Sequence, residues 1–495
     1  MNLSDRTAYP VHPLLPPDYL SPRRLAQSKA GCAAKRTPPE LSLHCWLNNL
    51  AAGPHWLDVT SLNPASVLDA DGSARILPSM SMSSSTLPSA KPGAISTGAR
   101  RSISRRSFLG SAGLGAAALG FSLNAPCAEK PIQGFERVAP NPDASKGWQP
   151  VSARKLRVGI VGYGVCKFGS QFGFQDHPNV EVVAVSDLFP DRCAQLAKEC
   201  RCEKTYPSLE ALVRDESIEA VFVATDAPSH VRHCLEVLKH GKHVASAVPA
   251  VFGSLKDADQ LFAAVKSSGR TYMLFETSCF HEDLHAMREL YRAGALGKLL
   301  YSEGEYFHYM EQPIASYKDW RVGLPPQWYP THSNAYYVGV SGGRFTHVSC
   351  LGSASRLEHL QPTNNRYRNG FGTEIAQFRT SEGGMARMAV SWDTPGHGGE
   401  MGRIRGEKGS FYGKFEGLEP SPVPISRPPL PPGVDVGGHG GSHGYLMNEF
   451  VTAILEGRKP LVDIATALNL TVPGIVAHQS ALQRGKLLRI PQYRF

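Results

Sequence analysis

The chain has 495 residues, 42% of them hydrophobic and 19% charged, which is enough apolar material for a buried core and enough length for two folded domains with additional segments. Its formal charge of +9 raises the question of nucleic acid, but much of the excess of Lys and Arg lies in residues 1–128 and no basic cluster with interleaved aromatic residues follows, so we expect no nucleic-acid partner. Ten cysteines are present, and the seven beyond residue 128 are an odd number within expected helices and strands, which argues against a disulfide scaffold.

The N-terminal part of the chain has the pattern of an export signal. Residues 1–98 are rich in Pro, Ser, Ala and Gly without apolar periodicity, which predicts disorder. The run SRRSFLG at Ser104–Gly110 precedes a short stretch rich in Gly, Ala and Leu. Paired arginines before such a stretch are typical of a twin-arginine signal, so residues 99–128 predict export by the twin-arginine machinery to the periplasm or beyond. The other interpretation is a linker with arginines by chance. A start at Met80 or Met82 would place the signal near the N-terminus, where such signals normally lie, and part of residues 1–98 would then be a mis-assigned start.

Strands and helices alternate from Leu156 onward, which predicts a parallel, doubly wound sheet in a domain that spans residues 154–275. The expected strands are Leu156–Gly162, Val180–Asp187, Glu219–Thr225, His243–Val248 and Thr271–Phe275. The expected helices are Asp191–Glu199, Ser208–Val213, His230–His240 and Leu255–Ser267.

The pattern changes in residues 276–495, which predict a second domain of the α+β class built on an antiparallel sheet. Its expected strands are Leu299–Tyr309, Thr373–Thr380, Met385–Trp392 and Ser410–Phe415. Its expected helices are Leu284–Ala293, Leu446–Leu455 and Asp463–Arg484, with a Pro-rich loop at Leu418–Gly433.

The segment GYGVCKFG directly after the first strand predicts a dinucleotide site. Gly162 permits a tight turn and Gly164 lets the backbone approach a pyrophosphate, which then lies at the N-terminus of the following helix. Asp187 closes the next strand, where a carboxylate accepts hydrogen bonds from a ribose 2′-hydroxyl and repels a 2′-phosphate, so NAD is favoured over NADP. Lys167 replaces the third glycine of the motif, and Gly169 follows it. The alternative is a Rossmann-like turn that binds no nucleotide.

Four segments of the chain together resemble the Gfo/Idh/MocA family of oxidoreductases: KLRVGIVGYG, VVAVSDLFPDR, YPSLEALVRDESIEAVFVATDAPSHVRHCLEVLKHGKHV and RAGALGKLLYSEGEY. The resemblance implies a Rossmann domain followed by a domain with a large open antiparallel sheet, through which the chain would self-associate. It also implies that Thr225 and the loop ATDAPSH with His230 line the nicotinamide side of the cofactor. The residues expected to bind NAD are Gly162, Gly164, Val165, Asp187, Thr225 and His230.

One departure from this family concerns the acid/base residue. Sugar dehydrogenases of the family carry Glu-Lys-Pro after the fifth strand, and the lysine assists proton transfer from the substrate hydroxyl. This chain has Ala247-Val248-Pro249 at that place, and valine cannot move a proton. Either another residue substitutes or the chemistry differs.

Candidate replacements come from several segments. Glu276 follows the expected strand Thr271–Phe275, at the end that faces the cofactor crevice of such a sheet. Tyr306 and His308 alternate with Phe307 and share one face of a strand, and His332 lies in the polar, turn-rich segment WYPTHSN. His439 and His443 lie in the glycine-rich segment GGHGGSHGY, which we expect to be a site loop.

The segments MLFETSCF, GEYFH, YPTH and HGGSHGY resemble the NAD-dependent α-N-acetylgalactosaminidases, which also lack the dehydrogenase lysine. Such glycosidases oxidise the sugar at C3 by hydride transfer, remove the acidified C2 proton, eliminate the aglycone, add water and return the hydride. The resemblance implies acid/base roles for Glu276, Tyr306 and His332. Ser442-His443 departs from the Met-Asp-like pair expected there, which leaves the detailed specificity open. The residues expected to contact the sugar are His308, Trp320, Arg321, Tyr329 and His439.

Export favours one reaction type. Free NAD is scarce outside the cytoplasm, so an exported enzyme is expected to hold its NAD tightly and regenerate it in each cycle. We therefore expect an NAD-dependent enzyme that acts on a sugar or glycoside by redox-neutral chemistry. The alternatives are a net NAD-dependent sugar dehydrogenase and a non-catalytic nucleotide-binding homologue. No His, Asp and Glu residues have a ligand spacing such as HxxxH on a helix, so we expect no metal.

Overall fold

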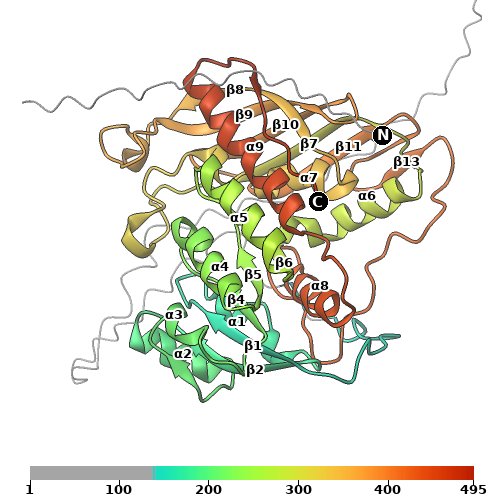
Figure 1. Ribbon diagram of the computed structural model, residues 1–495. Coiled ribbons are helices and arrows are strands. Elements are labelled where there is room, and N and C mark those ends of the chain that lie inside the picture. Colours follow the sequence, from blue (N-terminus) through green and yellow to red (C-terminus); the bar gives the residue numbers. More distant parts are fainter. Residues whose placement is uncertain (1–135, 137, 140) are drawn as a thin grey trace, which may run out of the picture. The chain divides into compact units, whose positions relative to one another are not determined.

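The computed structural model describes residues 136, 138–139 and 141–495 (Figure 1). The expected disordered segment, residues 1–98, and the expected twin-arginine signal, residues 99–128, lie outside these described residues. No helix within the described part is long and apolar enough to cross a membrane.

The first sheet has six parallel strands in the order β3-β2-β1-β4-β5-β6. Strand β4 is buried at all four of its residues, as expected for a strand covered on both faces by helices. The strands are β1 Leu156–Val161, β2 Val180–Ser186, β3 Thr205–Tyr206, β4 Ala220–Val223, β5 His243–Ala247 and β6 Tyr272–Phe275. The helices are α1 Phe168–Gln171, α2 Pro190–Glu199, α3 Leu209–Leu212, α4 His230–Lys239 and α5 Leu255–Ser268. This is the doubly wound sheet predicted from the sequence.

The helix after the glycine-rich turn is short. Helix α1 has only four residues and ends before Gly173, whose φ of 76° is left-handed. A single turn aligns few peptide dipoles, so the backbone of the turn itself has to supply most of the hydrogen bonds to a pyrophosphate.

The second sheet has eight strands in the order β13-β12-β11-β7-β10-β9-β8-β14. Neighbouring strands are antiparallel except for β7 and β10, which are parallel. The sequence predicted an antiparallel sheet, and the observed sheet is antiparallel apart from this one pair. The strands are β7 Leu299–Phe307, β8 Phe345–Ala354, β9 Phe371–Thr380, β10 Met385–Ser391, β11 Gly399–Gly406, β12 Gly409–Phe411, β13 Phe415–Gly417 and β14 Leu488–Arg489. The helices are α6 Glu282–Arg292, α7 Thr331–Ser341, α8 His443–Leu455 and α9 Ile464–Leu482.

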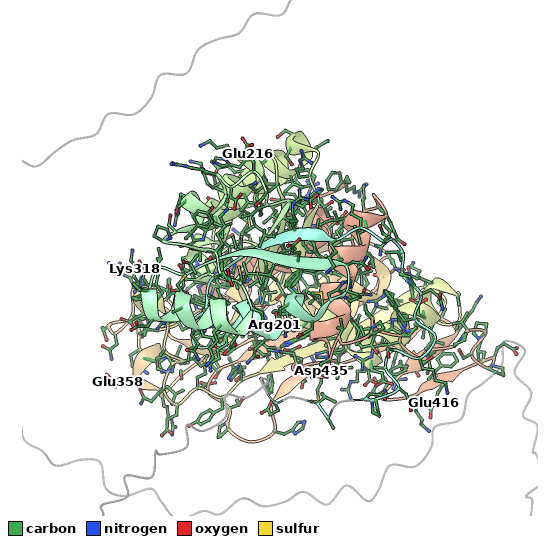
Figure 2. The ribbon with its side chains drawn as sticks, turned by 90° about the horizontal axis from the view of Figure 1, so that it is seen from below. Arg201, Glu216, Lys318, Glu358, Glu416 and Asp435 are labelled. Atoms are coloured by element: carbon green, nitrogen blue, oxygen red, sulfur yellow. The ribbon has the colours of Figure 1, made fainter. Side chains whose placement is uncertain are left out.

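One face of this sheet is covered by helices and the other is open. Along β9 buried residues alternate with exposed ones, so that Ala376 and Phe378 face the core while Ile375 and Arg379 face outward. Helix α7 packs on β7 and β11, and α9 packs on β8 (Figure 1). Charged side chains, among them Lys318, Glu358 and Glu416, point outward around the described part (Figure 2).

Several elements of the second domain were not predicted correctly. The segment around His332, expected to be turn-rich, is the first turn of α7, a helix whose residues are almost all buried. The expected strand Ser410–Phe415 is two short strands, because the chain turns at Gly413 with a φ of 70°. His443, expected in a site loop, is the first residue of α8. Strands β8 and β11 had no clear alternating pattern and were missed.

The two sheets meet where the first one ends. Strand β6 runs directly into the polypeptide of the second domain, and Leu274 donates a backbone hydrogen bond to the carbonyl of Val462 at 3.0 Å. Helix α9 contacts both α5 and β6. The carboxyl ends of the parallel strands thus lie beside the helix-covered face of the second sheet, and the site lies at this junction.

Candidate active site

A cavity of about 640 Å³ runs along the carboxyl ends of the parallel strands. It lies where the strand order reverses between β1 and β4, the usual place for a nucleotide in an open α/β sheet. Five of the six residues predicted to bind NAD line this cavity: Gly162, Gly164, Val165, Asp187 and Thr225.

The glycine-rich turn leaves room for a pyrophosphate. A Cβ atom at Gly162 would lie 2.3 Å from the carbonyl oxygen of Ala224, and the φ of +106° also requires glycine there. A Cβ atom at Gly164 would meet no protein atom within 4 Å, so the backbone at this position faces open space in the cavity. A Cβ atom at Gly169 would lie 2.4 Å from the carbonyl of Gly162, so Gly169 provides the close helix–strand approach that the third glycine of the motif normally provides.

Asp187 is fixed at the end of β2. Its carboxylate accepts hydrogen bonds from the backbone amides of Tyr163 at 2.7 Å and Phe189 at 2.9 Å. Each carboxylate oxygen retains lone pairs for a ribose hydroxyl, and a 2′-phosphate beside it would be repelled. The cavity therefore fits NAD.

The prediction for His230 differs from its position in the structure. His230 is 1% exposed, and its ring nitrogens lie 2.9 Å from the carbonyl oxygen of Pro249 and 3.1 Å from that of Thr225. His230 therefore contacts the backbone behind the cavity and does not line the cavity itself. His233, one helical turn later, lines the cavity and lies 2.8 Å from the hydroxyl of Thr225. The sequence pattern did not distinguish these two histidines.

A second, smaller cavity of about 40 Å³ adjoins the first. The two share wall residues, among them Val248, Arg321 and Tyr329, so an occupant of one would touch an occupant of the other. The hydroxyl of Tyr329 donates to the carbonyl of Val248 at 3.3 Å. Four of the five residues predicted to contact sugar line the smaller cavity: His308, Arg321, Tyr329 and His439. The fifth, Trp320, lines the larger one.

Glu276 and His332 form a buried pair. Glu276 follows β6 and its Oε1 accepts from the backbone amide of Ser278 at 3.0 Å, which caps the short helix that begins there. The same oxygen lies 2.8 Å from Nδ1 of His332. His332 lines the smaller cavity, whereas Glu276 is 0% exposed and lies behind it. We expected Glu276 to face the cofactor crevice, but its use as a helix cap turns the carboxylate toward the second domain.

Glu400 is a third member of this cluster. It lies on β11 directly opposite Tyr306 of β7, and its Oε1 is 3.5 Å from Nδ1 of His332. Its Oε2 accepts from the hydroxyl of Ser278 and lies 3.3 Å from Nε2 of His281. The sequence analysis missed Glu400, because the polar, glycine-rich segment GGEMGRIRG shows no strand pattern and no local motif.

Two carboxylates act on a single imidazole. Burial lowers the pKa of His332, but the negative charges of Glu276 and Glu400 and the hydrogen bond from Glu276 outweigh it and raise the pKa to about 9. Burial raises the pKa of Glu400, but the charges on His332 and His281 outweigh it and lower the pKa to about 2. At neutral pH His332 is therefore an imidazolium. Its Nδ1 faces the carboxylates, which leaves Nε2 for the cavity.

The other side of the small cavity carries neutral groups. Burial lowers the pKa of His308 and of His439 to about 4, so both rings are neutral at pH 7. Burial also raises the pKa of Tyr306 well above its ordinary value, and its hydroxyl lies 3.0 Å from Nδ1 of His308. The ring of Tyr306 packs edge-on against His332, with 4.5 Å between ring centroids. A proton donor and a proton acceptor thus border one cavity, which is the arrangement of an acid/base site.

The cluster also has the composition of a metal site. Ligand atoms of Glu276, His332 and Glu400 lie within 4.8 Å of one another. The sequence suggested no metal because these residues come from three separate elements and share no spacing. Nδ1 of His332 lies 2.8 Å from Oε1 of Glu276 and 3.5 Å from Oε1 of Glu400.

Comparisons with known proteins bear on the family and on the fold. The model of the Gfo/Idh/MocA oxidoreductase family, which has an NAD-binding Rossmann fold, matches residues 156–276. A glycosyl hydrolase family 109 protein of Bacteroides fragilis is 27% identical over 287 residues, which cover 53% of this chain and 60% of that protein. A glycosyl hydrolase family 109 protein of Streptomyces filamentosus is 24% identical over 424 residues, which cover 75% of this chain and 84% of that protein. The match to the Bacteroides protein thus spans less than two thirds of its length.

Solved structures share the fold. Levoglucosan dehydrogenase in complex with NADH and levoglucosan has a TM-score of 0.57 at 17% identity, covering 68% of this chain and 100% of that one. Aldose-aldose oxidoreductase from Caulobacter crescentus, complexed with glycerol, has a TM-score of 0.53 at 18% identity, with the same coverage of 68% and 100%. Residues 156–276 of this chain therefore match the Gfo/Idh/MocA family of NAD-binding oxidoreductases, and the solved structures share the fold of the Rossmann domain and the second sheet.

Proposed function

We propose that this chain is an NAD-dependent enzyme that cleaves a glycoside by a redox-neutral cycle. The observation that carries the proposal is the wall shared by the two cavities. It presents Val248 where dehydrogenases of the family have lysine, and the small cavity beside it is bordered by an imidazolium and a neutral tyrosine–histidine pair. The glycosyl hydrolase names of the sequence relatives support a glycoside as substrate.

NAD bound in the larger cavity would supply the hydride acceptor for one sugar carbon and return the hydride at the end of the cycle, while the proton of the oxidised hydroxyl would leave to water and be taken back from water. Oxidation acidifies the proton on the neighbouring carbon. Tyr306 and His308 remove that proton together: the phenol oxygen takes it while the phenol proton passes to Nδ1 of His308. The bond to the aglycone then breaks, and Nε2–H of His332 protonates the departing oxygen. Water adds by the reverse proton transfers, which restores both groups.

Arg321 and Tyr329 would orient the sugar between the two cavities. Both line both cavities, and the guanidinium of Arg321 is held over the ring of Trp320 at 4.1 Å. Both side chains lie at the wall formed by Val248, so they would hold the sugar beside the larger cavity.

Two further parts of the proposal concern location and assembly. The paired arginines before an apolar run support export by the twin-arginine machinery, which carries folded proteins and would deliver the enzyme with NAD already bound. The open face of the second sheet exposes Leu351, Ile375, Met385 and Met401, which supports self-association through that face.

The test uses the purified chain with no added nucleotide and a panel of aryl glycosides and free sugars. Aglycone release and absorbance of reduced nicotinamide are followed together. Aglycone release without accumulation of reduced nicotinamide is the expected result. Reduced nicotinamide that accumulates with free sugars, and no aglycone release, would instead establish a net dehydrogenase. Bound NAD without any turnover across the panel would indicate a nucleotide-binding homologue without catalysis.

A further inference from the structure

The glycine-rich turn carries a lysine where a dinucleotide motif normally has its third glycine. Lys167 has a left-handed backbone, with a φ of 49° and a ψ of 26°, which is unfavourable for a residue that has a Cβ atom. Gly169 provides the close helix–strand approach at this point, so the packing of α1 on the sheet does not account for a lysine at position 167. Glycine would fit this backbone better, and strain of this kind is typical of ligand-binding turns.

Half of the backbone amides in this turn are already used by the protein itself. Gly162 donates its amide to the last carbonyl of β2 at 2.9 Å, and Tyr163 donates its amide to the carboxylate of Asp187 at 2.7 Å. The amide of Lys167 donates to the carbonyl of Gly164 at 2.9 Å. Three of the six amides of GYGVCK are thus engaged, and the single turn of α1 adds only a weak dipole. A pyrophosphate at this turn therefore requires positive charge from a side chain.

The side chain of Lys167 is placed to supply that charge. It lines the larger cavity, and its Nζ lies 5.9 Å from the centre of the Tyr163 ring, which keeps the ammonium close to the turn. Within the described part of the chain, Lys167 forms no ion pair, and its side chain makes no hydrogen bond that caps α1. Arg232 lines the same cavity but is paired with Glu210 at 2.6 Å.

Two further cations of this cavity lie at other places along it. The guanidinium of Arg192 is held over the ring of Phe189 at 4.5 Å, after β2 and therefore on the ribose side. Arg321 is held over Trp320 at the wall that the two cavities share, on the sugar side. Lys167 is the cation of the glycine-rich turn itself.

We propose that the ammonium of Lys167 binds the pyrophosphate of NAD and slows the dissociation of the cofactor. This inference deepens the captive-cofactor part of the function proposed above and rests on it, but it does not depend on the cleavage of a glycoside. A lysine ammonium is a compact charge on a flexible stem, so it binds a phosphate without a fixed hydrogen-bond geometry. The residue that breaks the glycine pattern is thus the residue that holds the nucleotide in an enzyme that recycles its NAD.

The first test removes the charge. The protein is loaded with radiolabelled NAD, and release into excess unlabelled NAD is followed. Lys167→Gln should release NAD about three- to tenfold faster than the wild type, because a hydrogen bond to a charged group is lost at a partly solvated site. Lys167→Arg keeps the charge and should stay near the wild-type rate. Lys198→Gln is the matched control, since Lys198 is an exposed lysine on α2 outside the cavity, and it should release NAD at the wild-type rate.

Lys167→Gly separates binding from stability. Glycine restores the usual motif and relieves the left-handed backbone, so the Tm of the nucleotide-free protein should rise, while NAD release should be as fast as in Lys167→Gln. A lysine with a merely structural role predicts the opposite, a lower Tm with unchanged release. Release of NAD from Lys167→Gln and Lys167→Gly at the wild-type rate would overturn the proposal.

Fragments of the cofactor identify the group that Lys167 contacts. In calorimetric titrations of the nucleotide-free protein, Lys167→Gln should weaken the binding of ADP-ribose, which keeps the pyrophosphate, and leave the binding of adenosine unchanged. Added salt should weaken ADP-ribose binding more in the wild type than in Lys167→Gln. Equal weakening of ADP-ribose and adenosine would place Lys167 at the nucleoside and overturn the proposal, as would no change in either.

None of these measurements uses a glycoside, so the two proposals can fail separately. Faster NAD release from Lys167→Gln together with an inactive glycoside panel would support the role of Lys167 and contradict the glycosidase. Aglycone release by the wild type together with unchanged NAD release from Lys167→Gln would support the glycosidase and overturn the role of Lys167.

Discussion

The hydroxyl of Tyr329 donates a hydrogen bond to the carbonyl oxygen of Val248 at 3.3 Å, so a phenol from the second domain reaches position 248, where the family resemblance led us to expect a lysine. Both residues line both cavities. The chain thus keeps a polar group at this wall but places it on the opposite domain. Valine at position 248 is therefore compatible with a functional active site.

Val248→Lys tests this arrangement. An ammonium at position 248 would lie at the wall between the cavities, near Arg321 and the imidazolium of His332, and like charges there destabilise the proton donor. We expect aglycone release to fall by at least about tenfold, the equivalent of about 1.4 kcal/mol, with NAD still bound. Val248→Met is the control for side-chain length and should retain most of the activity. A Val248→Lys variant that releases aglycone at the wild-type rate would contradict the assignment of this wall to the reaction.

The two glycines of the nucleotide turn should respond differently to alanine. At Gly162 a Cβ atom would collide with the carbonyl of Ala224 at 2.3 Å, so Gly162→Ala should lower Tm and lose NAD together. At Gly164 the Cβ atom would enter open space, so Gly164→Ala should fold with the Tm of the NAD-free protein but fail to retain the nucleotide. Thermal melts and nucleotide released on denaturation distinguish the two outcomes. Retention of NAD by Gly164→Ala would mean that the pyrophosphate lies elsewhere.

The Rossmann domain was predictable from the sequence because its signals are local. Apolar runs such as Leu156–Val161 alternate with amphipathic helices, and each pattern is complete within about ten residues. The NAD site was predictable for the same reason, because Gly162 and Asp187 directly follow two consecutive strands of one sheet. His230 was expected to line that site but lies behind the cavity, whereas His233 lines it, since a loop motif does not show which of two nearby histidines faces the cavity.

The acid/base cluster was only partly predictable. Glu276, Tyr306 and His332 were selected individually, but no local pattern shows that Glu276 lies behind His332 or that Glu400 joins them. Glu400 reaches the cluster because β11 pairs with β7 in a register that sets it opposite Tyr306. That register is decided by the packing of the whole second sheet on α7, a helix that the polar segment around His332 did not indicate.

Stability should depend on pH through the same cluster. The pKa of His332 rises on folding to about 9 from an unfolded value near 6.5. Protonated His332 therefore contributes its full stabilisation to the free energy of unfolding below pH 6.5, and this stabilisation is lost as pH rises through 9. The shift corresponds to a stabilisation on the order of 3 kcal/mol. His308 and His439 affect stability in the opposite direction. Their pKa values fall on folding to about 4, so the free energy of unfolding decreases progressively as pH falls from 6.5 toward 4.

We therefore expect a maximum of Tm near pH 6.5, with losses on both sides. The decrease of Tm above pH 6.5 should be smaller in His332→Gln, because this variant has no imidazole to deprotonate at position 332. Its Tm at pH 6.5 should nevertheless be lower than that of the wild type, because two buried carboxylates lose their counter-charge. The double variant His332→Gln/Glu400→Gln should recover part of that Tm. An alkaline limb that persists unchanged in His332→Gln would show that other groups control it.

Retention of NAD should depend on a contact across the mouth of the crevice. Tyr317 comes from the second domain and packs edge-on against Phe189 after β2, with 6.2 Å between ring centroids, and both rings line the larger cavity. An aromatic pair of this kind contributes about 0.5–1.5 kcal/mol, so Tyr317→Ala should speed NAD dissociation by about two- to tenfold. Nucleotide release into excess unlabelled NAD measures this rate. Tyr412→Ala, on the edge of the second sheet beside Arg405, is the control and should release NAD at the wild-type rate. If Tyr317→Ala releases NAD no faster, the nucleotide is retained by the glycine turn and Asp187 alone, and the proposed captive cofactor does not depend on closure of the crevice by the second domain.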